Sequence, residues 1–237
     1  MTFSAKRVMA IFQKDMKDLS KNMYVGTTIL TPLILAMIYG GMIDNPTIEI
    51  HYFVINLALS IVTAFVQCAI IAEEKEKNTL RGLMLSPATI PEILGGKSLV
   101  TFILTIITII LCAMLTGYEP ANLGIIAIAI TISTLFYIAL GTLMGLLSRT
   151  VMEASIVILP VMFLFGFGTI LQPFAEDYPI LSVIDYLPST QLLELATLVE
   201  AGSGFVDVGG NLAIIFAWVV VATIATSIVF KKREMDE

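Results

Sequence analysis

The chain has 237 residues, of which 57% are hydrophobic and 14% are charged, and its mean hydropathy is +0.94. A soluble domain carries about 25% charged residues, so this composition excludes a soluble globular protein and indicates an integral membrane protein. The first twenty residues are rich in lysine and lack a compact apolar core, which predicts no cleavable signal peptide. Cys68 and Cys112 both fall within apolar runs, where they are expected to be packing residues rather than a metal site or a redox pair.

An amphipathic helix is predicted for residues 1–23. Its large apolar residues recur at helical spacing, and its lysines lie largely on the opposite face. The apolar stripe consists of Val8, Ile11, Phe12, Met16, Leu19 and Met23. This pattern is typical of a helix that lies flat in the headgroup region of a membrane.

Six apolar runs follow, each long enough to cross roughly 30 Å of hydrocarbon as a helix. They are residues 24–43, 53–72, 99–116, 123–147, 154–171 and 212–230. Backbone polar groups in lipid must be satisfied within the segment, so helices are the expected form. The sequence therefore predicts one all-α domain over residues 1–237, with six transmembrane helices and both termini on the same side.

The basic residues indicate the orientation of these helices. All 13 Lys and Arg residues fall before the first run, between the second and third, between the fourth and fifth, or after the sixth. The opposite loops carry acidic residues and no basic ones. The positive-inside rule then places both termini in the cytoplasm. We expect a multi-pass protein of the plasma (cytoplasmic) membrane.

The longest polar interruption is the segment 73–97 after the second run, which we call the elbow. Apolar residues at helical spacing behind a charged head predict an amphipathic cytoplasmic helix over about residues 72–85. Proline disfavours helix in the residue before it, so Ser86-Pro87 ends this helix. Thr89-x-x-Glu92 matches a capping box that opens the next helix. A solvated loop is the alternative, but a break with a capped restart favours a rigid surface that receives another protein.

Residues 172–211, between the fifth and sixth runs, are too polar to cross the membrane yet contain two strongly apolar stretches. Pro179 and Pro188 divide them into short helices, which predicts an external helical hairpin. Irregular backbone exposed to lipid is costly. The hairpin must therefore pack on protein, where it could act as a lid.

The sequence offers no catalytic constellation. No Asp, Glu, Lys, Arg or His lies at mid-depth in a predicted span, whereas ion-coupled carriers usually need such groups. His51 stands alone and is predicted to be a solvated loop residue. Gly96-Lys97-Ser98 looks like the end of a phosphate-binding loop, but the first glycine of that motif would fall at Pro91. We expect no catalytic residue, no metal and no cofactor in this chain.

Five residues within the spans are candidates for a transport path. They are Asn56, Thr63, Gln67, Phe163 and Phe167. Hydrogen bonds between helices are the alternative for the three polar residues, and plain contact with lipid is the alternative for the two aromatic ones. Gly141-x-x-x-Gly145 permits close approach of two helices, which is typical of packing.

Three motifs around the elbow carry a resemblance to a known family. They are Glu74-Lys75-Glu76-Lys77-Asn78-Thr79-Leu80, Leu85-Ser86-Pro87 and Ile90-Pro91-Glu92-Ile93-Leu94-Gly95-Gly96-Lys97. Together with Pro173, Tyr186-Leu187-Pro188 and the six spans, they give a chain that resembles, over essentially its whole length, the permease subunits of ABC exporters of the type 2 class. The Gly-Phe-Gly of residues 166–168 departs from the family's pattern at the outer gate.

The resemblance implies a non-catalytic permease energised by a separate ATPase, with two ATPase subunits and a second permease, a copy or a paralogue, in the transporter. ATP and Mg would be bound by the ATPase, membrane lipid would surround the chain, and no nucleic-acid partner is expected. The substrate would be an amphiphile such as a peptide, a drug or a lipid-like molecule. In such families the helix after the second span docks on the ATPase. The predicted coupling surface is Glu73, Glu74, Glu76, Thr79, Arg81, Leu83 and Met84. An ion-coupled secondary transporter without an ATPase is the alternative, while an intramembrane enzyme lacks candidate residues.

Overall fold

The computed structural model describes residues 4–19, 23–77, 79, 88–172 and 179–236. Within these ranges all regular structure is helical, which agrees with the predicted all-α membrane class. The helices are α1 Ala5–Leu19, α2 Met23–Met42, α3 Ile48–Leu57, the π-helix η1 Ala58–Phe65, α4 Val66–Glu76, α6 Ile90–Thr116, α7 Leu123–Leu147, α8 Val151–Val157, α9 Leu159–Gly166, α10 Gly168–Leu171, the 3₁₀ helix η3 Pro179–Tyr186, α11 Pro188–Glu200 and α12 Gly209–Asp236.

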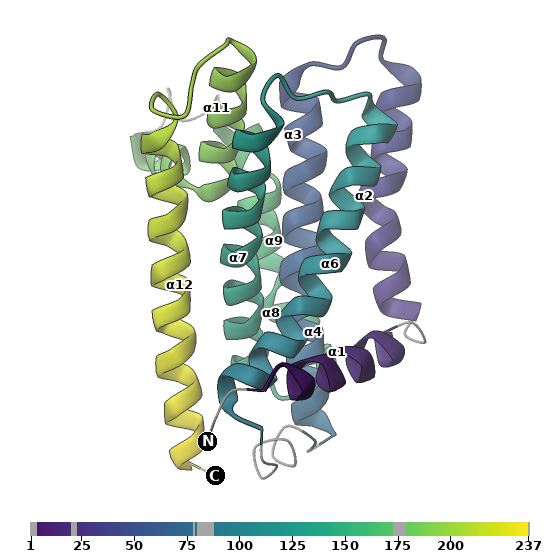
Figure 1. Ribbon diagram of the computed structural model, residues 1–237, viewed down its shortest axis with the longest axis vertical. Coiled ribbons are helices and arrows are strands. Elements are labelled where there is room, and N and C mark those ends of the chain that lie inside the picture. The colour runs from purple at the N-terminus through teal and green to yellow at the C-terminus, as the bar shows by residue number, and fades with distance from the viewer. Residues whose placement is uncertain (1–3, 20–22, 78, 80–87, 173–178, 237) are drawn as a thin grey trace.

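The long helices stand side by side, and α1 lies across one end of the bundle (Figure 1). We call that end the α1 end and the opposite end, where α11 lies, the α11 end. Both chain termini lie at the α1 end (Figure 1). Among the described residues, four helical stretches are long and apolar enough to cross a membrane: residues 48–76, 91–116, 123–147 and 209–231. These correspond to four of the six predicted spans; the first span corresponds to the 20-residue α2, and the apolar stretch at the fifth, residues 151–166, is shorter.

The second predicted span is the centre of the bundle. It begins earlier than predicted, at Ile48, and continues through α3, η1 and α4 without a break. Its most apolar stretch is 89% buried, against 22% for α12. His51 was predicted to be a solvated loop residue, and this is wrong. It is buried in α3, where its Nδ1 lies 3.0 Å from the Thr116 hydroxyl and its ring packs on Tyr118.

The fifth predicted span is not a single helix. Residues 154–171 are divided among α8, α9 and α10. Pro160 lies in the first turn of α9, where its ring removes the N–H that a continuous helix would need. The second break falls at Phe167, just before Gly168.

Close contact between backbones fixes α7 against the central rod. A Cβ atom at Gly141 would lie 2.4 Å from the carbonyl oxygen of Ala64, and one at Gly145 would lie 2.7 Å from that of Cys68. The interpretation of Gly141-x-x-x-Gly145 as a packing motif is confirmed. Any larger side chain at either position would push α7 away from η1 and α4.

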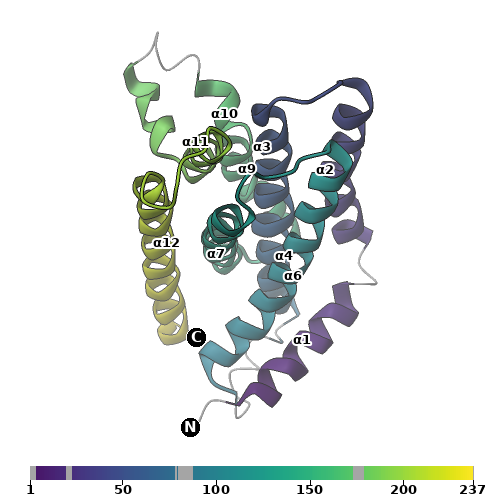
Figure 2. The same cartoon turned by 45° about the horizontal axis from the view of Figure 1, so that its top comes forward.

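The segment predicted to form an external hairpin contains two described helices, η3 and α11. The helices η3 and α11 begin at Pro179 and Pro188, the two residues predicted to divide this segment. Helix α11 packs against α12, α7 and α3, and Figure 2 shows it among these helices at the α11 end. The expectation that this segment packs on protein is confirmed.

Helix α1 lies across the bundle axis below α6 (Figure 2), and part of its apolar stripe packs on neighbouring helices. Leu19 is buried against Val66, Ile70 and Val100, and Phe12 and Met16 pack against the same cluster. Met23, predicted to end the stripe, is instead the first residue of α2. The stripe is used to hold α1 on α4 and α6.

Candidate functional site

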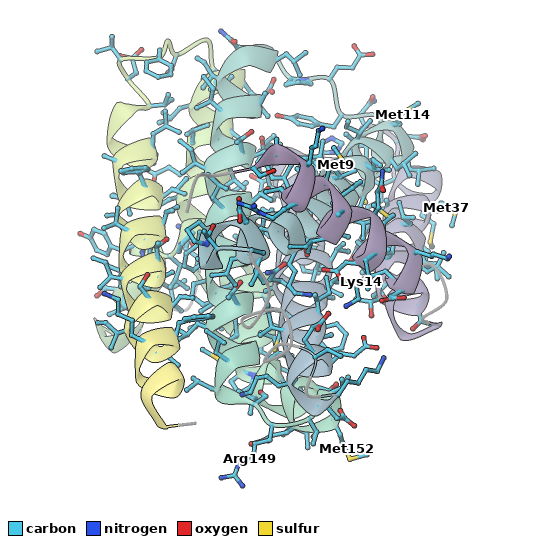
Figure 3. All side chains as sticks on the ribbon, turned by 60° about the horizontal axis from the view of Figure 1, so that its bottom comes forward. Met9, Lys14, Met37, Met114, Arg149 and Met152 are labelled. Atoms are coloured by element: carbon cyan, nitrogen blue, oxygen red, sulfur yellow. The ribbon has the colours of Figure 1, made fainter. Side chains whose placement is uncertain are left out.

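Four charged side chains meet where α1, α4 and α6 cross, and we call this group the charged junction. Its members are Lys14 and Asp15 of α1, Glu74 of α4 and Lys97 of α6. Figure 3 looks onto this end of the bundle, with Lys14 on α1 in front. The junction includes Glu74 near the start of the elbow and Lys97 at its end, so it joins both ends of the segment predicted to receive a partner to α1.

Lys97 is the centre of the junction and is fully buried. Its Nζ lies 3.0 Å from Oδ2 of Asp15 and 2.9 Å from Oε1 of Glu74. The Lys14 ammonium lies 2.6 Å from the same oxygen of Glu74, whose other oxygen accepts a hydrogen bond from the Thr79 hydroxyl. A buried ammonium needs such partners, because an isolated charge in a protein interior is strongly disfavoured. One side chain therefore holds three helices together.

The pKa shifts of Asp15 and Lys14 show how burial and ion pairing act on the charged groups of the junction. Burial raises the pKa of Asp15 even though the Lys97 ammonium opposes this change. A carboxyl group with a raised folded pKa stabilises the fold at low pH, and that contribution is lost as the pH rises through the folded pKa. Burial would lower the pKa of Lys14, but its hydrogen bond to Glu74 and the nearby carboxylates raise it overall. Burial of Asp15 thus opposes the ionised form that the Lys97 ammonium favours, and the pairing of the two side chains fixes the position of α1.

A second ion pair fixes the other end of α1. The Arg7 guanidinium donates two hydrogen bonds to Glu92, with Nε 3.0 Å from Oε2 and Nη2 2.8 Å from Oε1. Glu92 also accepts a hydrogen bond of 2.6 Å from the backbone N–H of Thr89, which is the predicted capping box. Gly96 lies between the two ion pairs, and a Cβ atom there would lie 2.9 Å from Ile11 and 3.0 Å from the carbonyl oxygen of Val8. The absence of a side chain lets α1 cross α6.

The end of α4 also holds the connection between α7 and α8. Lys75 Nζ donates to the carbonyl oxygens of Leu146, at 2.6 Å, and Ser148. The Glu76 carboxylate accepts a hydrogen bond of 2.8 Å from the backbone N–H of Val151. A cation at a helix C-terminus and an anion at a helix N-terminus satisfy free backbone groups and suit the helix dipoles. Consecutive residues of α4 thus link the elbow to α7 and α8.

The structure separates the predicted coupling residues into three groups. Glu73, paired with Lys77 at 2.5 Å, is partly exposed, and Glu76 and Thr79 are exposed. Glu74 is buried in the charged junction, so it faces inward and does not belong to an exposed surface. Arg81, Leu83 and Met84 lie outside the described residues. The predicted helix 72–85 also needs a correction, because residues up to Glu76 belong to the transmembrane helix α4.

A small cavity of about 130 Å³ opens beside the junction, between α1 and the end of α4. It is lined by Lys14, Asp15, Asp18, Leu19, Ile70, Glu73, Glu74, Lys77 and Thr79.

Sequence reasoning missed Asp15. The available signal was that Asp15 lies four residues from both Ile11 and Leu19, on the apolar face of its helix.

The polar residues predicted for a transport path are all fully buried and hydrogen-bonded between elements. Asn56 Nδ2 donates to the carbonyl oxygen of Ser189 at 3.1 Å, and the Thr63 and Thr105 hydroxyls are 2.8 Å apart. Gln67 accepts from Thr101 at 2.6 Å and donates to Thr142 at 3.0 Å. These contacts support hydrogen bonding between helices in this conformation.

Phe163 and Phe167, the aromatic candidates for the path, are stacked with ring centroids 5.6 Å apart. Phe163 is 62% exposed on the surface of the bundle.

Among the described residues no group of three or more His, Cys, Asp or Glu side chains could hold a metal. Cys68 and Cys112 are buried and unpaired, as expected of packing residues.

Long apolar helices, a helix across their end and a packed helical hairpin define a polytopic helical membrane protein. The family described as ABC-2 family transporter protein matches residues 13–228. The chain belongs to this family, which confirms the resemblance found in the elbow motifs. No curated protein matches the chain.

Replacing Lys97 by methionine tests the junction. The substitution leaves the carboxylates of Asp15 and Glu74 buried with Lys14 alone, so the free energy of unfolding should fall by about 3–5 kcal/mol. Asp15→Asn is the matched control, because the side-chain amide oxygen can still accept a hydrogen bond from Lys97. The free energy of unfolding should therefore change by no more than about 1 kcal/mol. Chemical unfolding in detergent, followed by Trp218 fluorescence, measures both. Equal losses would contradict the central position of Lys97.

Alanine substitutions at the neighbouring glycines Gly95 and Gly96 of α6 test whether α1 crosses α6 as described. Gly95 has no atom within 4 Å of an added Cβ, so Gly95→Ala should stabilise the helix by up to about 1 kcal/mol. Gly96→Ala should instead destabilise the chain by about 1–3 kcal/mol, since Ile11 or the Val8 carbonyl must move. Thermal unfolding of the two variants gives the comparison. A stabilising Gly96→Ala would show that α1 does not pack as described.

Proposed function

We propose that this chain is the transmembrane permease subunit of an ATP-driven exporter that moves an amphiphilic substrate out of the cytoplasm. The energy would come from a separate ATPase that docks on the elbow. Membership of the ABC-2 family supports a permease of an ABC transporter. The observation that carries the mechanism is the buried Lys97, which ties the elbow to α1 and α6.

In this proposal, closure of two ATPase subunits on ATP and Mg moves the elbow of each permease. The docking residues are the partly exposed Glu73 and the exposed Glu76 and Thr79, together with Arg81, Leu83 and Met84. The charged junction passes the movement to α1 and α6, and Lys75 and Glu76 pass it to α7 and α8. Helices joined in this way move as a rigid body, which biases the bundle between two conformations. A second permease, identical or paralogous, completes the path.

The location of the charges supports the proposal over an ion-coupled carrier. Among the described residues, the buried Asp, Glu and Lys side chains are Asp15, Glu74, Glu92 and Lys97. All four lie at the α1 end, none at mid-depth. Carriers driven by protons or cations usually hold ionisable groups within the membrane.

Docking is tested by placing charge on the elbow. Leu83→Asp/Met84→Asp would bury two carboxylates at the ATPase interface, at a cost of several kcal/mol. We expect the yield of the permease–ATPase complex and the stimulation of ATP hydrolysis by the permease to fall at least tenfold. Val206→Asp, at a position that is 91% exposed at the α11 end, is the control and should change neither quantity. Normal complex formation by the double variant would remove the elbow from the mechanism.

The orientation of the chain in the membrane can be tested with reporters on its two predicted sides. With the basic residues inside, a reporter at Asp236 should be cytoplasmic and one at Gly202, between α11 and α12, should be external. Protection of each reporter from a membrane-impermeant reagent in intact cells measures this. A cytoplasmic signal from Gly202 would contradict both the orientation and the number of spans.

A further inference from the structure

A cavity of about 290 Å³ lies at the α11 end of the bundle. Its lining comes from three segments: residues 46, 48 and 51 at the start of α3, residues 117–119 in the turn after α6, and Glu200 at the end of α11. Figure 1 shows these segments at the same end of the bundle. Pockets for small molecules measure about 300 Å³ and upward, so this cavity has room for a small organic group as well as for a single ion.

One wall of the cavity is an aromatic stack held in place by hydrogen bonds. His51 is only 7% exposed, its Nδ1 lies 3.0 Å from the Thr116 hydroxyl, and its ring packs on Tyr118 with centroids 4.9 Å apart. The Tyr118 ring also meets Tyr52 edge to face at 5.7 Å. Gly117, next to Tyr118 in the chain, has open space beside it, because no atom lies within 4 Å of an added Cβ. The wall is therefore set by contacts within the protein, before any ligand binds.

Two carboxylates complete the lining. The Tyr118 hydroxyl and the backbone N–H of Ala121 both donate to Oε1 of Glu200, at 3.1 and 3.2 Å, and so orient that carboxylate. Glu119 is exposed, and among the described residues the ion pairs involve neither Glu119 nor Glu200. The sequence has no Lys or Arg in residues 22–74, 98–148 or 150–230, the ranges that supply the whole lining. Two negative charges therefore line the cavity without a basic residue in the segments that form it.

These features select the chemistry of a ligand. Carboxylates accept hydrogen bonds and pair most strongly with charged donors, and an aromatic ring attracts a cation. Within the described ranges no group of three or more His, Cys, Asp or Glu side chains is placed to hold a metal ion, so the two carboxylates suit a larger cation that brings its own N–H donors. We propose that this cavity binds an organic ammonium group, with Glu119 and Glu200 as its counter-ions and Tyr118 against its carbon atoms. Two sources carry such a group, a free amine and the head of phosphatidylethanolamine.

Equilibrium dialysis of radiolabelled hexylammonium against the full chain in dodecyl maltoside micelles tests the site. Binding to empty micelles is subtracted. The test variants are Glu119→Gln, at an exposed position, and Glu200→Gln, whose amide oxygen can still accept from Tyr118 and Ala121. The matched control is Glu194→Gln, which changes an exposed glutamate of the same helix that does not line the cavity. Competitors are 1-hexanol, the uncharged counterpart, and phosphatidylethanolamine or phosphatidylglycerol added to the micelles.

We expect the wild type and Glu194→Gln to bind hexylammonium with the same Kd. The Kd should rise about tenfold in Glu119→Gln and in Glu200→Gln, because each loses one charged partner. Excess 1-hexanol should not displace the amine. Displacement by phosphatidylethanolamine but not by phosphatidylglycerol identifies the lipid head as the source, and displacement by neither identifies a free amine.

Three results would overturn the proposal. The first is that the wild type binds no more amine than empty micelles do, and the second is that Glu119→Gln and Glu200→Gln bind it as tightly as the wild type. The third is that 1-hexanol displaces the amine, or that calcium chloride does so when sodium chloride of equal ionic strength does not. Glu119 makes no ion pair within the described residues, so its variant remains informative if Glu200→Gln fails to fold. The measurements contain no ATPase, so their outcome is independent of the proposed transport function.

Discussion

The fold at the α1 end depends on one buried ammonium. An ammonium in a protein interior must be paired, because its desolvation costs several kcal/mol. Lys97 can find its partners only where Asp15 of α1 and Glu74 of α4 reach it together. This requirement fixes the rotation of α1 and the position at which it crosses α6. In this position Leu19, Phe12 and Met16 of the apolar stripe pack with Val66, Ile70 and Val100.

The two ends of the bundle are held by different interactions. The α1 end is joined by ion pairs and by Lys75 and Glu76, which bind the backbone between α7 and α8. At the α11 end, the hairpin is held by apolar packing, by the hydrogen bond from Trp218, and by the Glu200 carboxylate, which accepts from Tyr118 and from the backbone N–H of Ala121. The segment next to it is broken at Pro160 and Phe167. Charge pairs strongly resist separation in a low dielectric. We therefore expect the helices to move relative to one another at the α11 end, while the helices at the α1 end move together as a rigid unit.

Much of this architecture could be predicted from hydrophobic runs and prolines. The helical class, the capping box at Thr89 and the starts of η3 and α11 follow from local sequence, because each depends on neighbouring residues. The charged junction could not be predicted in this way. Lys97 is 82 positions from Asp15 and 23 from Glu74, so these pairs could be found only once the fold was known. The position of Asp15 on an apolar helix face was the one signal in the sequence. His51 was misjudged for the same reason, since its partner Thr116 belongs to another helix.

The central claim is that the junction makes the α1 end a single rigid unit. Met9 of α1 and Met152 of α8 are exposed at this end (Figure 3), and the native cysteines are buried. Spin labels at these two positions, in a chain whose native cysteines are replaced by alanine, report the distance between α1 and α8 in the complex with its ATPase. We expect one narrow distance distribution, unchanged between the nucleotide-free and ATP-trapped states, and a broad one in Lys97→Met. A distance that changes with ATP in the otherwise wild-type chain would contradict the account.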